Sequence, residues 1–261
     1  QAKKNSLNSL KKLAEYAQNG VVNNLIVVDN AKIESIFKDV SPMHFFQVSN
    51  EAIVSPLHAF NTYSTHGSPG MKVMDPMEWT RILIDGGGLS LYGEMTVENF
   101  EEETALAEAV VNNLTSGLLA EGFDLEQTNY VGVLFVANER VWQKVPAVAI
   151  NYALTMLQHH AGTAKAYHGI YTDDIEEDVF KVYSFFSGLA LPDERIEVLK
   201  KEVAETQATL KSKDEKRNMS LQLDTGGNKV TNKVEEINEK IKASKSPFAK
   251  FKQGLIDKRK K

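Results

Sequence analysis

The sequence predicts an α/β to α+β fold, in which a mixed sheet is flanked by helices. Short apolar, β-branched runs typical of buried strands alternate with stretches of helical periodicity. Of the 261 residues, 42% are hydrophobic, which is enough for a sizeable core. The absence of cysteine excludes disulfides and thiolate metal sites. No apolar run approaches the roughly 20 residues that span a bilayer, so we expect a soluble, cytosolic protein.

The first 65 residues predict a helix, a strand and a second helix. LIVVDN, from Leu25 to Asn30, resembles a strand buried on both faces, which suggests a parallel sheet of which only this strand is present. Ser41-Pro42 offers an N-cap and a first-turn proline. Pro56 lies within the second helix and should kink or split it. The apolar stripe of the opening helix is Leu7, Leu10, Leu13 (or Ala14) and Ala17; that of the second is Phe46, Asn50, Ile53, Leu57 and Phe60.

The middle of the chain predicts a compact α+β module with its own strands. LSLYGEM is the first expected strand, and a long helix should follow from about Val97 to Glu121. VPAVAINYALTML predicts another helix. The remaining expected strands are NYVGVLFVANE, AKAYHGIYTDD and DVFKVYSFFSGLAL.

The stretch VMDPMEW, Val73 to Trp79, carries two carboxylates three residues apart around a proline. Asp75 suits a helix N-cap, Pro76 suits the first helical position, and Glu78 can reach back to close a capping box. The local pattern alone therefore favours a structural role. Gly86 to Gly88 follow the helix and are expected to end it through positive-φ positions rather than to cradle a phosphate.

Charge is distributed unevenly along the chain. Residues 245–261 carry seven basic side chains against Asp257, or +6, which leaves −11 for residues 1–244 of a chain whose net charge is −5. Before this tail, a charged helix carries a thin apolar stripe that could lie on the domain surface or on a partner. Its members are Ile196, Leu199, Val203 and Leu210. The basic tail is either a solvating end or a docking segment, because Phe248, Phe251, Leu255 and Ile256 interleave with its lysines.

Other polar clusters do not predict a site. The histidines show no metal-ligand spacing with nearby acids, and His159 and His160 are adjacent, hence on different helix faces. The acidic run from Asp173 to Asp178 does not match a calcium loop and is expected to form a solvated hairpin loop. We therefore predict no metal ligands among these side chains.

From LIVVDNAKIESI onward, a series of motifs resembles the tubulin/FtsZ superfamily in family order. FFQVSNEAI looks like the central helix, GSPGMKVMDPMEWTRIL like the synergy loop and its helix, and GGGLSLYGEM like the start of the C-terminal domain. The later strands continue the match to about residue 200. The residues of the VMDPMEW motif and the basic tail after an acidic body look most like those of bacterial plasmid-partition and phage tubulins (TubZ-like). The family's phosphate-binding loop is not found, so the sequence looks like the C-terminal portion of a longer GTPase.

The resemblance implies roles for five residues and for GTP/GDP with Mg²⁺ in the intact protein. Asn30 matches the guanine- or ribose-contacting asparagine, although an Asn in a turn explains it locally. Phe46 and Asn50 share a helix face and would stack on the base and read its edge. Asp75 and Glu78 match the acids that complete the nucleotide site of the neighbouring subunit. Glu78 would orient water, with Asp75 as its support.

The resemblance also implies an organisation and a function. We expect the end of a GTP-binding domain with the central helix (1–65), a GTPase-activating C-terminal domain (66–192), a helix (193–225) and a flexible basic tail (226–261). The intact protein would be a cytoplasmic GTPase that forms filaments and segregates plasmid or phage DNA, with Lys245–Lys261 engaging an adaptor on centromeric DNA. We expect the isolated chain to be inactive. The alternative is a non-enzymatic module that caps such filaments or binds the adaptor.

Overall fold

The computed structural model describes residues 2–66, 71–102 and 104–223. The chain forms two compact units, Gln1–Glu202 and Val203–Lys261, which are considered separately. The first contains every described strand, and the long helix α8 begins in it. The expected flexible tail and its adaptor-binding segment fall outside the described residues.

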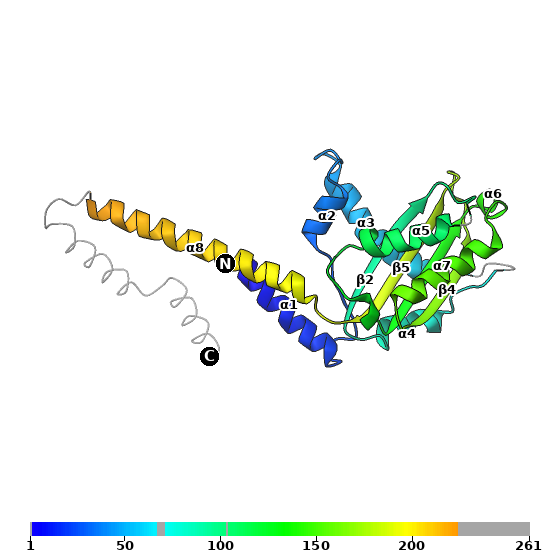
Figure 1. Ribbon diagram of the computed structural model, residues 1–261, viewed down its shortest axis with the longest axis horizontal. Helices are drawn as coiled ribbons and strands as arrows, with labels where there is room; N and C mark the ends of the chain where they lie inside the picture. Colours follow the sequence, from blue (N-terminus) through cyan, green and yellow to red (C-terminus); the bar gives the residue numbers. More distant parts are fainter. Residues whose placement is uncertain (1, 67–70, 103, 224–261) are drawn as a thin grey trace, which may run out of the picture. The chain divides into compact units, whose positions relative to one another are not determined.

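The first unit is built on a mixed five-stranded sheet of order β1-β2-β5-β3-β4 (Figure 1). β5 runs antiparallel to both of its neighbours, β2 and β3, whereas β1 and β4 pair in parallel with β2 and β3. The strands are β1 (Leu25–Ile26), β2 (Leu89–Val97), β3 (Tyr130–Ala137), β4 (Lys165–Thr172) and β5 (Phe180–Leu189). The predicted fold class is confirmed, and each of the four expected strands of the module is present.

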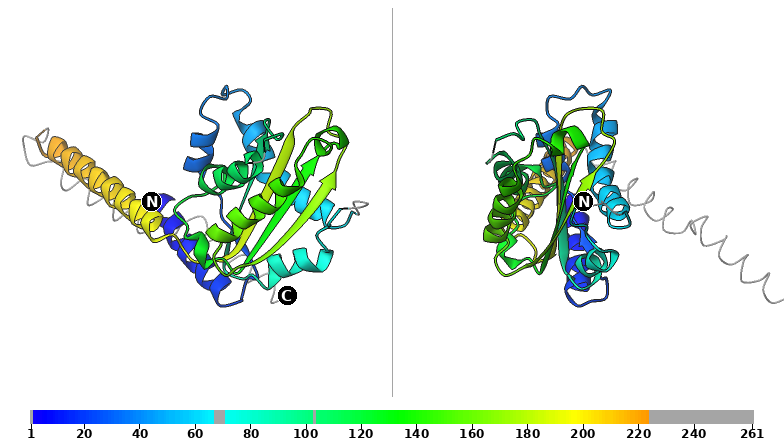
Figure 2. Two further views of the ribbon diagram at one scale, coloured as in Figure 1. Left: turned by 45° about the vertical axis from the view of Figure 1, so that its right-hand side comes forward. Right: turned by 90° about the vertical axis from the view of Figure 1, so that its right-hand side faces the viewer.

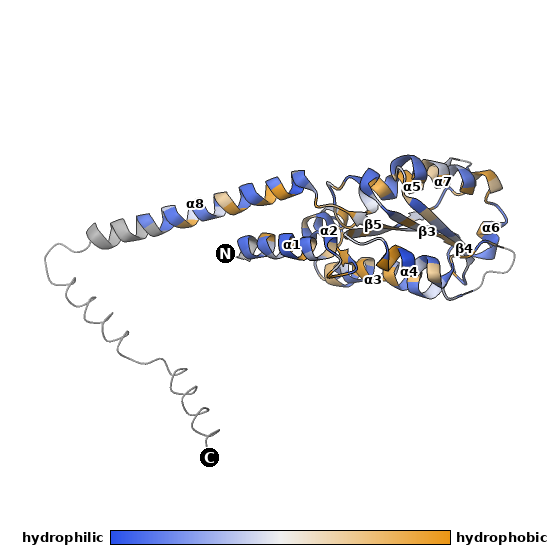
Figure 3. Cartoon of the chain, turned by 90° about the horizontal axis from the view of Figure 1, so that it is seen from below, coloured by the Kyte–Doolittle hydropathy of each residue, from blue (hydrophilic) through white to orange (hydrophobic). Residues whose placement is uncertain are grey.

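Helices cover both faces of this sheet. Helices α5 and α7 pack on one face, and α3 and α4 pack on the other (Figures 2 and 3). The helices are α1 (Ala2–Gln18), α2 (Asn30–Ile36), α3 (Phe45–Tyr63), α4 (Pro76–Ile84), α5 (Ala105–Asn112), α6 (Glu139–Trp142), α7 (Ala147–His160) and α8 (Asp193–Leu223). This three-layer arrangement places α4 and its N-terminal acids on the same face as the central helix α3.

The core consists of two clusters because the central strands are apolar on both faces. In β5, Val182 and Phe186 point toward the α5 and α7 layer, whereas Tyr183 and Phe185 point toward α3 and α4. The same alternation in β3 buries Val133 on the first face and Leu134 on the second. Strands buried on both faces read as continuous apolar runs, which is why the sequence marked them clearly.

The expected long helix from Val97 to Glu121 is wrong at both ends. Val97 is the last residue of β2 and pairs with Phe180, so its β-branched side chain belongs to the sheet. Helix α5 covers only the middle of the range, and a π-helical turn from Asn113 to Gly117 ends it. Leu119 then donates its backbone N–H to the Tyr92 carbonyl at 3.2 Å, because the chain has returned to the sheet.

Three N-terminal expectations also need correction. Of Leu25–Asn30, only two residues form a strand, which is half-buried and pairs in parallel with β2 of this same sheet. The chain at Ser41 forms a turn, and α3 begins at Phe45. Pro56 does not split α3, which continues as α-helix to Tyr63. The predicted opening helix is confirmed as α1, with Leu7, Ala14 and Ala17 among its buried residues.

Helix α4 ends at Ile84 with Asp85 as its C-cap, and two of the three glycines that follow have the predicted positive φ. Gly87 and Gly88 have φ values of +62° and +57°, which residues with a Cβ rarely adopt. Their backbone is already bonded within the sheet region: the Gly188 N–H donates to the Gly87 carbonyl at 3.0 Å. Asn129 Nδ2 donates to the Gly86 carbonyl at 3.0 Å. This turn therefore connects α4 to β2.

Candidate functional site

The two acids of VMDPMEW form the predicted capping box at the start of α4. Asp75 Oδ1 accepts the Met77 backbone N–H at 2.7 Å, and Glu78 Oε2 accepts the Asp75 N–H at 3.0 Å. Asp75 has extended backbone angles and Pro76 occupies the first turn, as a capped helix start requires. Asp75 is exposed and Glu78 is half-buried. The box therefore holds both carboxylates at the protein surface.

The loop that leads into this box is bonded to the edge of β4. The Ile170 N–H donates to the Lys72 carbonyl at 2.7 Å, and the Met74 N–H donates to the Tyr171 hydroxyl at 2.8 Å. Met74 itself is buried, with 1% of its side chain exposed. The chain is thus fixed on both sides of Val73 and immediately before Asp75.

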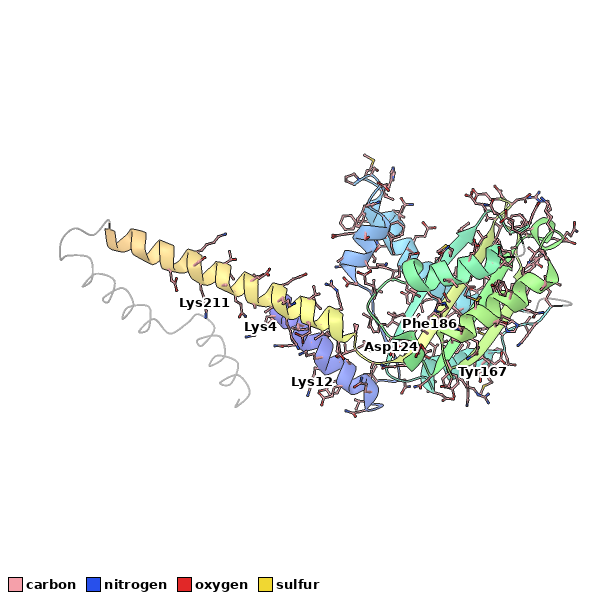
Figure 4. All side chains as sticks on the ribbon, in the orientation of Figure 1. Lys4, Lys12, Asp124, Tyr167, Phe186 and Lys211 are labelled. Atoms are coloured by element: carbon pink, nitrogen blue, oxygen red, sulfur yellow. The ribbon has the colours of Figure 1, made fainter. Side chains whose placement is uncertain are left out.

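Helix α4 is held against the sheet by its apolar side. Trp79 stacks on Phe60 of α3 with ring centroids 4.7 Å apart and meets Phe185 of β5 edge-on at 5.0 Å. Its indole N–H donates to Asn61 Oδ1 at 2.8 Å. On the outer side, a hydrogen bond with Tyr167 of β4 raises the pKa of Arg81. Figure 4 labels Tyr167 on this strand. The acids therefore rest on a rigid support.

Exposed apolar side chains occur on the segment that carries the two acids. Met77, between the two acids, is 62% exposed, and Val73, two residues before Asp75, is 36% exposed. Ile84, 50% exposed, lies at the other end of α4. Exposed apolar groups next to charged ones also occur where a surface contacts another protein chain.

Asn30 is the exposed first residue of α2, directly after its N-cap. The cap is Asp29, whose Oδ1 accepts the Ala31 N–H at 3.0 Å. Asp29 is also paired with Arg195 of α8: Nε lies 2.7 Å from Oδ2, and Nη2 lies 3.2 Å from Oδ1. This pairing raises the pKa of Arg195. Asn30, Asp29 and Arg195 line a cavity of about 590 Å³.

Phe46 and Asn50 lie in the first two turns of α3, and both are exposed, Phe46 by 75%. The predicted apolar stripe is therefore not buried at this end of the helix. The buried side of α3 passes instead through Ser49, Pro56, Ala59 and Phe60. The exposed ring and amide share one face, four residues apart, and are open to a ligand or another chain.

The structure does not bring the five residues into one site. Neither Phe46 nor Asn50 lines the cavity that contains Asn30. Helix α3 has 19 residues, a length of about 28 Å, and it separates Phe46 and Asn50 from the loop that carries the acids. The acids and the candidate base contacts therefore lie at opposite ends of α3.

The acidic run after β4 is better ordered than a solvated hairpin loop. It is not a hairpin, because β3 lies between β4 and β5 and the connection must pass over its end. Asn138 Nδ2 donates to the Ile175 and Glu177 carbonyls and to Asp178, and Arg140 pairs with Asp178 at 2.8 Å. These bonds lower the pKa of Asp178. Among the described residues, no group of three or more His, Asp or Glu side chains is arranged to hold a metal.

His168, beside the acid-bearing loop, predicts a pH dependence of stability. Burial, with a smaller contribution from Lys72, whose Nζ lies 3.4 Å from His168 Nδ1, lowers the His168 pKa to about 4. The unfolded ring has a pKa near 6.5, so between about pH 6.5 and 4 the unfolded chain binds more protons. The free energy of unfolding should therefore fall as the pH drops through this window.

We expect the wild type to lose about 1 kcal/mol more than His168→Gln between pH 7 and 5, because the half-exposed ring is partly screened. Urea unfolding of both chains at the two pH values measures this difference. Equal losses would contradict the assignment.

Sequence reasoning missed two residues that this geometry makes important, Tyr171 and Arg195. Both act on partners far away in the sequence, at separations of 97 and 166 residues. A tyrosine in an apolar strand and an arginine at a helix start carry no local signal of such partners.

Within the part of the chain that the structure describes, none of the helices is long and apolar enough to cross a membrane.

Comparison with solved structures shows the fold of the tubulin/FtsZ superfamily. A helical model of a four-stranded TubZ-Bt filament matches with a TM-score of 0.69 and 20% identity over 83% of this chain and 57% of that chain. GDP-form protofilaments of TubZ from Bacillus thuringiensis serovar israelensis match with a TM-score of 0.69 and 18% identity over 85% and 59%. An FtsZ dimer from M. jannaschii matches with a TM-score of 0.56 and 18% identity over 71% of this chain and 50% of that chain.

These matches confirm the resemblance expressed by the motifs, and those to TubZ have the higher TM-scores. The chain spans 57% to 59% of the length of the two TubZ chains. No protein-family model matches the sequence, and neither does any curated protein.

Proposed function

We propose that this chain, which has the tubulin/FtsZ fold, is the C-terminal portion of a filament-forming GTPase that segregates plasmid or phage DNA. Asp75 and Glu78 would complete the GTP site of the neighbouring subunit. The intact protein would bind GTP or GDP with Mg²⁺. The solved neighbours include a TubZ filament and GDP-form protofilaments, which support self-association and guanine nucleotide binding as properties of such proteins.

The observation that carries the proposal is the placement of the acids. They stand at the surface next to the exposed Met77, at the far end of α3 from the candidate base contacts Phe46 and Asn50. Acids placed there cannot serve a nucleotide held by Asn50 of the same chain, but they can serve one held by the next copy. Phosphoryl transfer requires strict placement of water and charge, so an acid supplied across an interface makes hydrolysis depend on assembly.

The chain's own residues suggest a division of roles. Glu78 would orient the attacking water, and Asp75, which donates its N–H to Glu78, would fix the Glu78 carboxylate. Asn30 and Asn50 would offer amide donors and acceptors to the nucleoside, and the exposed Phe46 ring would stack on the base. Helix α4 would present Met77 and Ile84 to the neighbouring subunit.

The test joins the chain to its upstream reading frame and measures GTP turnover per subunit against protein concentration, with sedimentation of filaments in parallel. We expect turnover per subunit to rise steeply above the concentration at which filaments appear. Turnover that is independent of concentration would contradict a site shared between subunits. Filament capping without turnover would favour the non-enzymatic module.

A further inference from the structure

We propose that Tyr171 is a positioning residue for the acid pair, acting through the backbone of Met74. The inference rests on the proposed function, because it assigns a residue that sets the pose of Asp75 and Glu78. The Tyr171 hydroxyl accepts the Met74 N–H at 2.8 Å and faces the Met74 carbonyl at 3.4 Å. Met74 directly precedes Asp75, so this contact fixes the chain one residue before the capping box.

Two bonds from adjacent residues of β4 orient the loop. The Ile170 N–H holds the Lys72 carbonyl at 2.7 Å, and the Tyr171 hydroxyl holds Met74 two residues later. One bond would leave the loop free to rotate about its anchor, whereas two define its direction. β4 is an edge strand of the sheet, so this edge is occupied by the loop.

The rest of the strand is built around the tyrosine ring. Gly169 lies two residues earlier on the same face, and a Cβ there would come within 2.4 Å of the Tyr171 ring. The Tyr171 carbonyl accepts the Trp142 indole N–H at 2.9 Å, and its ring lies 5.0 Å from that of Tyr63 at the end of α3. The absence of a side chain at Gly169 thus leaves the space that the ring occupies.

The chemistry of the contact requires a neutral phenol. A hydroxyl can accept from one backbone group and donate to another, whereas a phenolate can only accept. Only 1% of Tyr171 is exposed, and burial raises its pKa by more than the bond with the Met74 backbone lowers it, while the nearby Glu78 carboxylate raises it further. The hydroxyl therefore remains protonated over the range in which such a protein works, and the contact to Met74 is present throughout it.

A tyrosine that merely filled the core would behave like Tyr92, which supplies a matched control. Tyr92 belongs to the same apolar cluster, is also 1% exposed, and donates its hydroxyl to a backbone carbonyl, that of Ile53, at 2.8 Å. Each Tyr→Phe change therefore removes one buried phenolic oxygen bonded to backbone. Only Tyr171→Phe releases the acid-bearing loop.

The first measurement uses the 261-residue chain and hydrogen exchange of the Met74 amide. We expect Tyr171→Phe to lose about tenfold in protection at Met74, because a buried N–H loses its acceptor. Tyr92→Phe should leave Met74 within about twofold of wild type. Gly169→Ala, which keeps the phenol but displaces its ring, should lower protection as Tyr171→Phe does. Equal protection in all variants would overturn the proposal.

The second measurement uses the chain joined to its upstream frame and separates kcat from KM for GTP. We expect Tyr171→Phe to lower kcat about tenfold, with KM and the assembly concentration unchanged, and Tyr92→Phe to have less than a twofold effect. If Tyr171→Phe matches Tyr92→Phe while Glu78→Gln is inactive, only the positioning role is overturned. If Glu78→Gln remains active, the proposed function fails, and the positioning role fails with it.

Discussion

Replacing Glu78 with glutamine should abolish assembly-dependent GTP turnover and leave the filaments intact. A capping box accepts glutamine in place of glutamate at this position. The bond from the Asp75 N–H, which is 3.0 Å long in the wild type, is therefore retained. What is lost is the charge that would orient water at the neighbouring nucleotide. Loss of such a group typically costs 10²–10⁴-fold, so we expect kcat to fall at least about 100-fold. Steady-state turnover and sedimentation of the same samples measure the two effects separately.

Two further variants distinguish capping from chemistry. Glu78→Ala removes both the carboxylate and the bond to the Asp75 N–H, and should cost about 1 kcal/mol of stability in addition to activity. Asp75→Asn keeps an N-cap oxygen for the Met77 N–H, since asparagine caps as well as aspartate. If Glu78→Gln were active and only Glu78→Ala impaired, Glu78 would be a capping residue alone.

Much of the fold followed from the sequence because its central strands are apolar on both faces. The runs that become β3 and β5 lie in the middle of the sheet, where helices cover both sides, so their pattern is continuous and unambiguous. The capping box was also predictable, because Asp75, Pro76 and Glu78 are local to one another. Local chemistry and double burial therefore account for what was predicted correctly.

The errors arose where tertiary contacts decide the structure. Val97 continues an alanine- and glutamate-rich helical pattern, yet its pairing with Phe180 places it in a strand. Asn50 lies on the predicted helical stripe, but the buried side of α3 passes through its neighbour Ser49, so Asn50 remains exposed. Tyr171 carried no signal, because its partner Met74 lies 97 residues earlier. In each case the deciding contact is distant in the sequence.

Replacing Trp79 with alanine should cost about 3–5 kcal/mol of the free energy of unfolding, the usual cost of removing a large buried aromatic side chain. The ring is 5% exposed, stacks on Phe60 at 4.7 Å and meets Phe185 at 5.0 Å, so its loss leaves a cavity between α4, α3 and β5. Trp79→Phe keeps an aromatic ring in this position and loses mainly the bond to Asn61, so it should cost about 1 kcal/mol. Denaturant unfolding of the three chains gives both values.

Comparing the Trp79 and Tyr171 variants also tests how the acids are supported. The capping box is local to α4, but the position of α4 on the sheet depends on Trp79 from one side and on the bonds of the loop to β4 from the other. Trp79→Phe keeps an aromatic ring against the sheet, so it should retain Met74 protection at a temperature where the chain is fully folded. Tyr171→Phe removes the bond to β4, so it should lose this protection while the stability of α4 stays nearly unchanged. We expect this pair of results if both supports are needed. A Trp79→Ala chain as stable as the wild type would mean that α4 does not depend on this packing, and that the box and the β4 anchor alone hold the acids in place.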